Sequence, residues 1–258
     1  MKNRILWTVV GVLLIAMAAL PAGAWAADED DAVGWADSVN VGFGLEWLKG
    51  NTEMLCYNYS LAYTAAFPEE WDLSLNLEGR YGETDGELSQ ANNKMALAVE
   101  RILFRGNVSL YYNGDIEEDR FQNIYTRINS GIGLKLNFGP AWWVAFSASS
   151  VPVVDYTRTF DTLESEGLWR LRNKATLTFK FDQETENNLK FEFTHQPDMK
   201  DFSDYRYEFN AALNLQILGK LGFQNAFKME HVSRPLGSEE IEVQKKNYSI
   251  TSSLTLSL

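Results

Sequence analysis

Apolar and polar residues alternate strictly over long stretches of this chain. In one run, Val39, Val41, Phe43, Leu45 and Trp47 are separated by small or polar residues. Successive side chains of a β-strand point to opposite faces, so this pattern predicts a strand with one apolar and one polar face. A helix would require apolar residues at every third or fourth position, and the period of two does not meet that requirement.

Runs of this kind recur about twelve times along the chain. They fall at residues 39–47, 55–64, 71–78, 94–100, 107–112, 127–138, 142–148, 169–181, 189–194, 207–217, 221–230 and 247–258. A tilted strand needs about 9–11 residues to cross a bilayer, and bacterial single-chain barrels have an even number of strands. The pattern therefore predicts an all-β fold, a transmembrane antiparallel up-and-down β-barrel of about 12 strands.

The connections expected between these runs alternate in length. The short ones fall at residues 68–70, 105–106, 139–140, 182–187 and 218–220, and the long, mostly acidic ones at 50–53, 83–92, 117–123, 155–166, 197–204 and 235–245. The first of the long set is itself short. Outer-membrane barrels have short periplasmic turns and longer external loops, so we expect both chain termini on the periplasmic side.

A soluble β-sandwich would also alternate, because one face of each sheet is buried and the other is wet. Two features favour the membrane barrel. The polar face carries charges flanked by small residues, as a wet lumen would. The apolar face carries aromatic residues near the strand ends, among them Trp47, Trp71, Trp142 and Trp169, as membrane-interface girdles do.

The first 26 residues have the features of a secretory signal peptide. Lys2 and Arg4 precede an apolar run over residues 5–20, and Ala24-Trp25-Ala26 supplies a small-residue cleavage site. The apolar run is short for the alternative, an uncleaved anchor helix, which needs roughly 20 residues. We expect a signal peptide at 1–26, a short periplasmic segment at 27–36 and the barrel of a bacterial outer membrane at 37–258.

Charge and cysteine content narrow the function classes. The formal net charge is −12, which argues against nucleic acid as a partner. The single cysteine, Cys56, cannot form an internal disulfide and lacks the neighbours of a nucleophile or metal ligand. We expect no cofactor and no metal, a monomer, and as partners the lipid and lipopolysaccharide of the outer membrane and, during insertion, the barrel-assembly machinery.

Several short segments, taken in order, resemble one family. They are Gly42 to Thr52, Asn92-Asn93-Lys94, Asp119-Arg120-Phe121, Gly131-Ile132-Gly133-Leu134 and Ser233-Arg234-Pro235. In these segments the chain resembles the domain of unknown function 481, also known as the salt-induced outer membrane protein family. The resemblance implies an outer-membrane barrel and carries no established activity.

The first candidate site is the lumen, because many charged residues fall in the polar phase of the strands. They are Glu46, Glu78, Arg80, Glu100, Arg127, Lys135, Arg170, Arg172, Lys174, Lys180, Lys190, Glu192, Glu208, Lys228 and Glu230. Opposite charges that pair across strands would close a narrow barrel with a structural or envelope-stress role, which is the interpretation we favour. The alternative is a small passive pore, since twelve strands lie between filled and open barrels.

The second candidate is His231 with Ser233, two residues apart on one strand face. This pair of a base and a hydroxyl resembles the His-x-Ser dyad of outer-membrane lipid hydrolases. Nucleophilic catalysis also needs a third group that orients the base, and an oxyanion hole. Arg234-Pro235 follows where those lipases carry an asparagine, and the last strand offers no convincing third member. The competing interpretation is a histidine of the interfacial girdle.

The third candidate is a set of acidic clusters in the expected loops. They comprise Glu83, Asp85 and Glu87; Glu117, Glu118 and Asp119; Asp161, Glu164 and Glu166; and Glu239, Glu240 and Glu242. Their oxygen atoms could hold calcium, but the spacing matches no calcium-binding loop. Solvated loops that share divalent cations with lipopolysaccharide are the preferred interpretation.

Overall fold

The computed structural model describes residues 36–49, 54–67, 70–84, 87–104, 107–120, 122–160, 165–183, 185, 187–236 and 245–257. These residues form twelve strands: β1 (Ala36–Lys49), β2 (Met54–Phe67), β3 (Trp71–Thr84), β4 (Glu87–Phe104), β5 (Val108–Asp119), β6 (Ile124–Ala141), β7 (Val144–Thr159), β8 (Ser165–Lys180), β9 (Asn188–Pro197), β10 (Tyr205–Leu218), β11 (Leu221–Val232) and β12 (Lys246–Ser257). The expected signal peptide at 1–26 lies outside the described residues, as does nearly all of the expected segment at 27–36.

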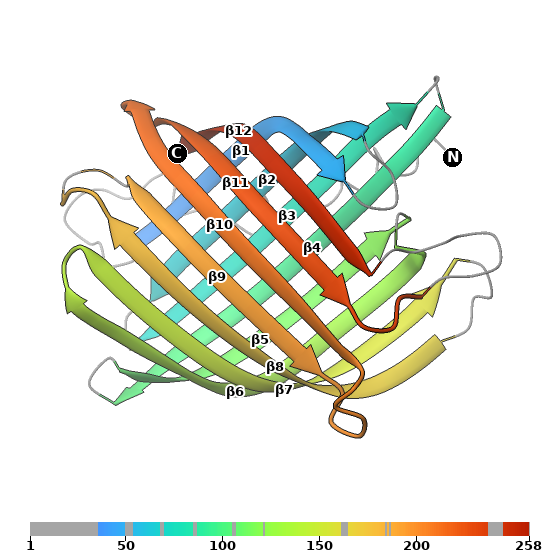
Figure 1. Ribbon diagram of the computed structural model, residues 1–258. Coiled ribbons are helices and arrows are strands. Elements are labelled where there is room, and N and C mark those ends of the chain that lie inside the picture. Colours follow the sequence, from blue (N-terminus) through green and yellow to red (C-terminus); the bar gives the residue numbers. More distant parts are fainter. Residues whose placement is uncertain are drawn as a thin grey trace. The chain divides into compact units, whose positions relative to one another are not determined.

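Every strand pairs antiparallel with its neighbours in sequence, and β1 pairs with β12 to close the barrel (Figure 1). The closing register places Phe43 opposite Leu254 and Trp47 opposite Ile250. A closed sheet has no edge strand, so its backbone N–H and C=O groups are paired within the protein. The predicted twelve-stranded up-and-down barrel is confirmed.

The apolar phase of the alternation covers the outside of the barrel. Phe43 is 62% exposed, Ile132 58% and Phe138 60%, and similar side chains surround them. Such a continuous apolar surface is unfavourable in water and favourable against lipid hydrocarbon. No helix in the described part of the chain is long and apolar enough to cross a membrane.

Several strands extend further than the sequence pattern predicts. β5 continues through Asp119 and β7 through Thr159, so the predictions of loops from residue 117 and from residue 155 are wrong for these positions. The turn predicted at 139–140 is also wrong, because β6 runs to Ala141 and the turn comprises Trp142 and Trp143. In these added strand segments the inward-facing residues are charged. The segments therefore have the composition of a loop, although their backbone belongs to the sheet.

The seam between β6 and β7 depends on two inward-facing glycines. A Cβ atom added to Gly131 would lie 2.2 Å from the carbonyl oxygen of Pro152, and one added to Gly133 would lie 2.1 Å from that of Ser150. The paired register is interrupted between these positions, resuming at Leu134. Because only glycine permits so close an approach, the two residues let the β7 backbone lie against β6 at this seam.

Replacing Gly133 by alanine is expected to destabilise the barrel by roughly 1–3 kcal/mol, because the added methyl group must displace the backbone of β7. Gly167→Ala on β8 is the matched control, since nothing lies within 4 Å of its Cβ position. The measurement is the temperature at which the compact, fast-migrating form of an unheated sample is lost on gels. Equal transition temperatures for the two variants would contradict this account of the seam.

Candidate functional site in the barrel lumen

The lumen has two unlike ends. At the turn end β1 begins, β12 ends, and the strands are joined at residues 68–70, 105–107, 142–143, 181–187 and 219–220. At the loop end, the opposite one, lie the connections at 50–53, 85–86, 120–123, 160–164, 198–204 and 233–245. Most of the inward-facing charged residues lie in the half of the barrel nearer the loop end.

Asp155 on β7 is the centre of the most buried ionic cluster. Its side chain is 1% exposed and lies 3.0 Å from Arg170 Nε on β8 and 2.8 Å from Arg206 Nη2 on β10. The hydroxyl of Thr157 donates to it at 2.8 Å. Arg170 also binds Asp204 at 2.9 Å. Two guanidinium groups thus share one carboxylate, which removes these charges from water and joins β7, β8 and β10 across the lumen wall.

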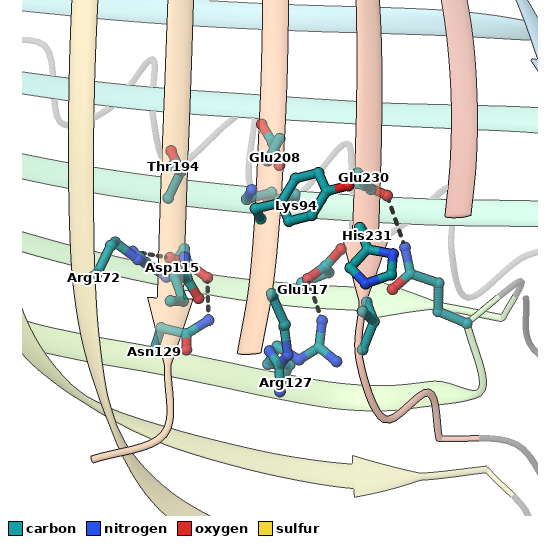
Figure 2. A pocket seen from close by; sticks show the side chains of 15 residues that line it. Lys94, Asp115, Glu117, Arg127, Asn129, Arg172, Thr194, Glu208, Glu230 and His231 are labelled. Atoms are coloured by element: carbon teal, nitrogen blue, oxygen red, sulfur yellow. Dashed lines mark hydrogen bonds and ion pairs between the residues drawn. The ribbon is translucent and has the colours of Figure 1, made fainter. Parts of the chain in front are cut away.

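A second cluster lies beside the first and joins β5, β6 and β8. Asp115 lies 2.7 Å from Arg172 Nη1 and accepts a hydrogen bond of 2.7 Å from Asn129 (Figure 2). Arg127 and Glu117 form an ion pair at 3.3 Å. Because β6 and β7 separate β5 from β8 in the barrel, the Arg172–Asp115 pair passes over the inner face of both strands.

A third cluster reaches the other side of the barrel. Lys228 on β11 lies 2.7 Å from Glu230 and 3.3 Å from Glu208, and Gln122 donates to Glu230 at 3.0 Å. Gln122 lies in the connection between β5 and β6, and four strands separate β6 from β11 on one side of the barrel. The Gln122–Glu230 hydrogen bond therefore crosses the lumen instead of following its wall.

We call these three clusters, together with Lys94, which lines the same pocket, the charged layer. Its members are Lys94, Asp115, Glu117, Gln122, Arg127, Asn129, Asp155, Thr157, Arg170, Arg172, Asp204, Arg206, Glu208, Lys228 and Glu230. The clusters line a pocket of about 80 Å³. Figure 2 shows the side chains around this pocket pointing toward one another from several strands. A second pocket of about 200 Å³ lies beside Asp155, Arg170 and Arg234.

A much larger cavity occupies the lumen between the charged layer and the turn end. It has a volume of about 980 Å³ and reaches the turn at Gly219 and Lys220. We call it the vestibule. Its wall on β1 to β4 carries small residues such as Ser60, Ser74 and Ala96, which leave the space open. At its inner end Lys94, Asp115, Arg172, Glu208 and Lys228 belong to the charged layer.

The structure places most of the predicted lumen residues in ion pairs. Glu46, Arg80, Glu100, Arg127, Lys135, Arg170, Arg172, Lys174, Lys190, Glu192, Glu208, Lys228 and Glu230 each have a partner of opposite charge within 4 Å. Glu78 lines the vestibule. Lys180 is exposed at the turn end of β8.

Sequence reasoning missed Asp115, Asp155, Asp204 and Arg206, which carry much of the charged layer. Arg206 continues the inward phase of its predicted run by one step, and Asp155 continues the inward phase of β7 four steps beyond Ser147, so extending the alternation would have found both. Glu117 and Asp119 were expected in a solvated loop. Instead they lie on β5, where Asp119 is 2% exposed and accepts a hydrogen bond from Asn92.

His231 and Ser233 each have other partners. The ring of His231 stacks on Tyr207 with centroids 4.8 Å apart and lies 5.7 Å from Tyr205. The Ser233 hydroxyl accepts a hydrogen bond of 2.8 Å from the Tyr205 backbone N–H and lies 3.4 Å from Asp204 Oδ1. The histidine thus belongs to an aromatic group on β10 and β11, and the serine anchors the start of β10.

The described loop residues offer no metal site. Among them, no three His, Cys, Asp or Glu side chains gather in a way that could hold an ion. Of the predicted acidic clusters, Asp85, Asp161, Glu164, Glu239, Glu240 and Glu242 lie outside the described residues, as do the side chains of Glu83 and Glu87. In the loop at 198–204, hydrogen bonds from Ser203 and then from Arg234 hold the pKa of Asp201 below its usual value.

Comparison with known proteins decides the family. Residues 41–256, nearly the whole barrel, match the family described as protein of unknown function, DUF481. The chain belongs to this family. Among curated proteins, none matches the sequence.

Solved structures share the fold of this DUF481 barrel at low sequence identity. The NanC porin matches with a TM-score of 0.56 and 12% identity over 84% of this chain and 100% of that one. An outer membrane channel from Pseudomonas putida F1 matches with a TM-score of 0.55 and 9% identity over 90% of this chain and 100% of that one. Both matches extend over the whole of the other chain, so the closed barrel of this protein is a fold that a porin and an outer membrane channel also have.

Replacing Asp155 by asparagine is expected to destabilise the barrel by roughly 3–5 kcal/mol, because two buried arginines lose a shared counter-charge. Asp201→Asn is the matched control. Asp201 binds Arg234 at 2.8 Å, but both side chains are largely exposed, so no measurable loss is expected. The readout is the urea midpoint of tryptophan fluorescence in detergent micelles. An Asp155→Asn barrel as stable as the control would show that the cluster does not stabilise the fold.

Proposed function

We propose that this protein is a bacterial outer-membrane barrel with a structural role in the envelope, whose lumen is closed at the loop end by the charged layer. The observation that carries the proposal is the hydrogen-bonded set of ion pairs across the lumen, between which only two small pockets of about 80 and 200 Å³ remain in the described part of the barrel. A solute crossing the barrel would have to separate these pairs.

The energetics of buried charge support closure. Breaking a buried ion pair by removing one partner costs roughly 3–5 kcal/mol, because the remaining charge has neither water nor a counter-ion. The charged layer contains several such pairs, and neighbouring pairs share residues, as Asp155 does with Arg170 and Arg206. Opening a path would disturb more than one pair at a time, so the closed arrangement is strongly favoured.

The proposed orientation places both termini in the periplasm. Short connections at the turn end and mostly longer ones at the loop end support it, because outer-membrane barrels carry their short turns on the periplasmic side. The vestibule then faces the periplasm and the charged layer faces outward. Outer-membrane lipid and lipopolysaccharide surround the apolar surface, and the barrel-assembly machinery inserts the chain as a monomer.

A passive pore for small solutes is the second candidate function. The observation that favours it is the vestibule of about 980 Å³, which already opens much of the lumen. The two functions differ only in whether the charged layer lets ions pass, so conductance distinguishes them.

Planar-bilayer recordings of the folded wild-type barrel are expected to show no discrete conductance steps. The variant Lys94→Ser, Glu208→Ser, Lys228→Ser and Glu230→Ser removes two positive and two negative charges where the vestibule meets the charged layer, and it is expected to conduct. Gel migration before and after heating verifies that each protein is folded.

The control removes an ion pair nearer the turn end. Lys135 pairs with Glu100, which also accepts a 2.7 Å hydrogen bond from Asn137, and neither charged residue lines the vestibule or the small pocket. The variant Glu100→Ser and Lys135→Ser is expected to remain silent. Regular steps from the wild-type barrel would contradict closure and favour the passive pore.

A further inference from the structure

The vestibule is positively charged although the chain as a whole is acidic. Six cationic and four anionic side chains line it, whereas the formal net charge of the chain is −12. Of the cations, Arg172 and Lys228 are held by carboxylates of the charged layer. The excess positive charge therefore lies toward the turn end, where Lys174, Lys190 and Lys220 line the vestibule.

The excess has a specific source on β8 and β9. Lys174 Nζ lies 2.9 Å from one carboxylate oxygen of Glu192, and Lys190 Nζ lies 3.3 Å from the other. Two ammonium groups thus share one carboxylate, which leaves a net charge of +1. Their side chains are 36% and 45% exposed, whereas that of Glu192 is 17% exposed. The cations, more than the carboxylate, face the open space.

The other side chains of the vestibule are rich in neutral hydrogen-bonding groups. Hydroxyls of Ser60, Ser74 and Thr255 and amides of Asn76 and Asn210 line it, and small residues between them leave room. Such groups bind hydroxyls equally well as donors and acceptors. A cavity of about 980 Å³ that combines these groups with a cation pair suits a small ligand with both negative charge and hydroxyl groups.

We propose that the vestibule binds small hydroxylated carboxylate anions. Lys174 and Lys190 bind the carboxylate groups of the ligand, and the serine, threonine and asparagine side chains bind its hydroxyl groups. The ligand enters from the turn end. This inference extends the proposed function, because it assigns a ligand class to the space that the charged layer leaves open, and it does not require the barrel to conduct.

Isothermal titration of the folded barrel in detergent micelles with citrate tests the proposal. The wild type is expected to bind citrate. Glu192→Gln raises the local positive charge and is expected to tighten binding at least about threefold, and the double variant Lys174→Gln and Lys190→Gln to weaken it by a similar factor. Lys180→Gln is the matched control, because Lys180 lies on β8 outside the vestibule lining. It is expected to bind as the wild type does.

Tricarballylate, which is citrate without its hydroxyl group, tests the neutral contacts. It is expected to bind more weakly than citrate to the same wild-type protein. Equal affinities would overturn the hydroxyl part of the proposal. The site itself would be overturned if the wild type did not bind citrate, or if Glu192→Gln failed to tighten citrate binding. The Glu192→Gln measurement remains decisive even if the double lysine variant does not fold.

The titration and the bilayer recordings test the two proposals independently. Citrate binding together with conductance steps from the wild type would refute closure and leave the binding site standing. Silent bilayers without citrate binding would refute the binding site and leave closure standing.

Discussion

The membrane leaves no water to satisfy backbone polar groups, and this constraint determines the structure. A sheet crossing hydrocarbon must therefore close on itself, as the pairing of β1 with β12 achieves. Closure in turn separates the two phases of every strand, one toward lipid and one toward the lumen. The exposed Phe43, Ile132 and Phe138 and the enclosed Asp155 and Arg170 are two consequences of the same ladder of hydrogen bonds.

Twelve strands create an intermediate lumen that side chains fill unevenly. Near the loop end long polar and charged side chains reach across the lumen. Arg172 pairs there with Asp115, and Gln122 donates a hydrogen bond to Glu230. Near the turn end small residues such as Ser74 leave the vestibule open. Barrel size permits either a plug or a pore, so side-chain length and charge pairing at each level decide how far the lumen opens.

The alternation predicted the strands and the direction of most side chains because period two follows directly from strand geometry. It could not predict which charges meet, because Asp115 and Arg172 become neighbours only through the curvature of the closed sheet. Asp155 and Glu117 were assigned to loops because their surroundings are polar, although the sheet continues through them. The close approach of the β7 backbone to Gly131 and Gly133 likewise appears only when β7 is in place.

The proposed function depends on closure of the lumen by the charged layer in the native barrel. Chloride efflux from liposomes carrying the folded wild-type protein tests it most directly, because the whole population of barrels contributes to the signal. If the lumen is closed, the efflux rate equals that of protein-free liposomes. A rate that rises in proportion to the number of inserted barrels would contradict it.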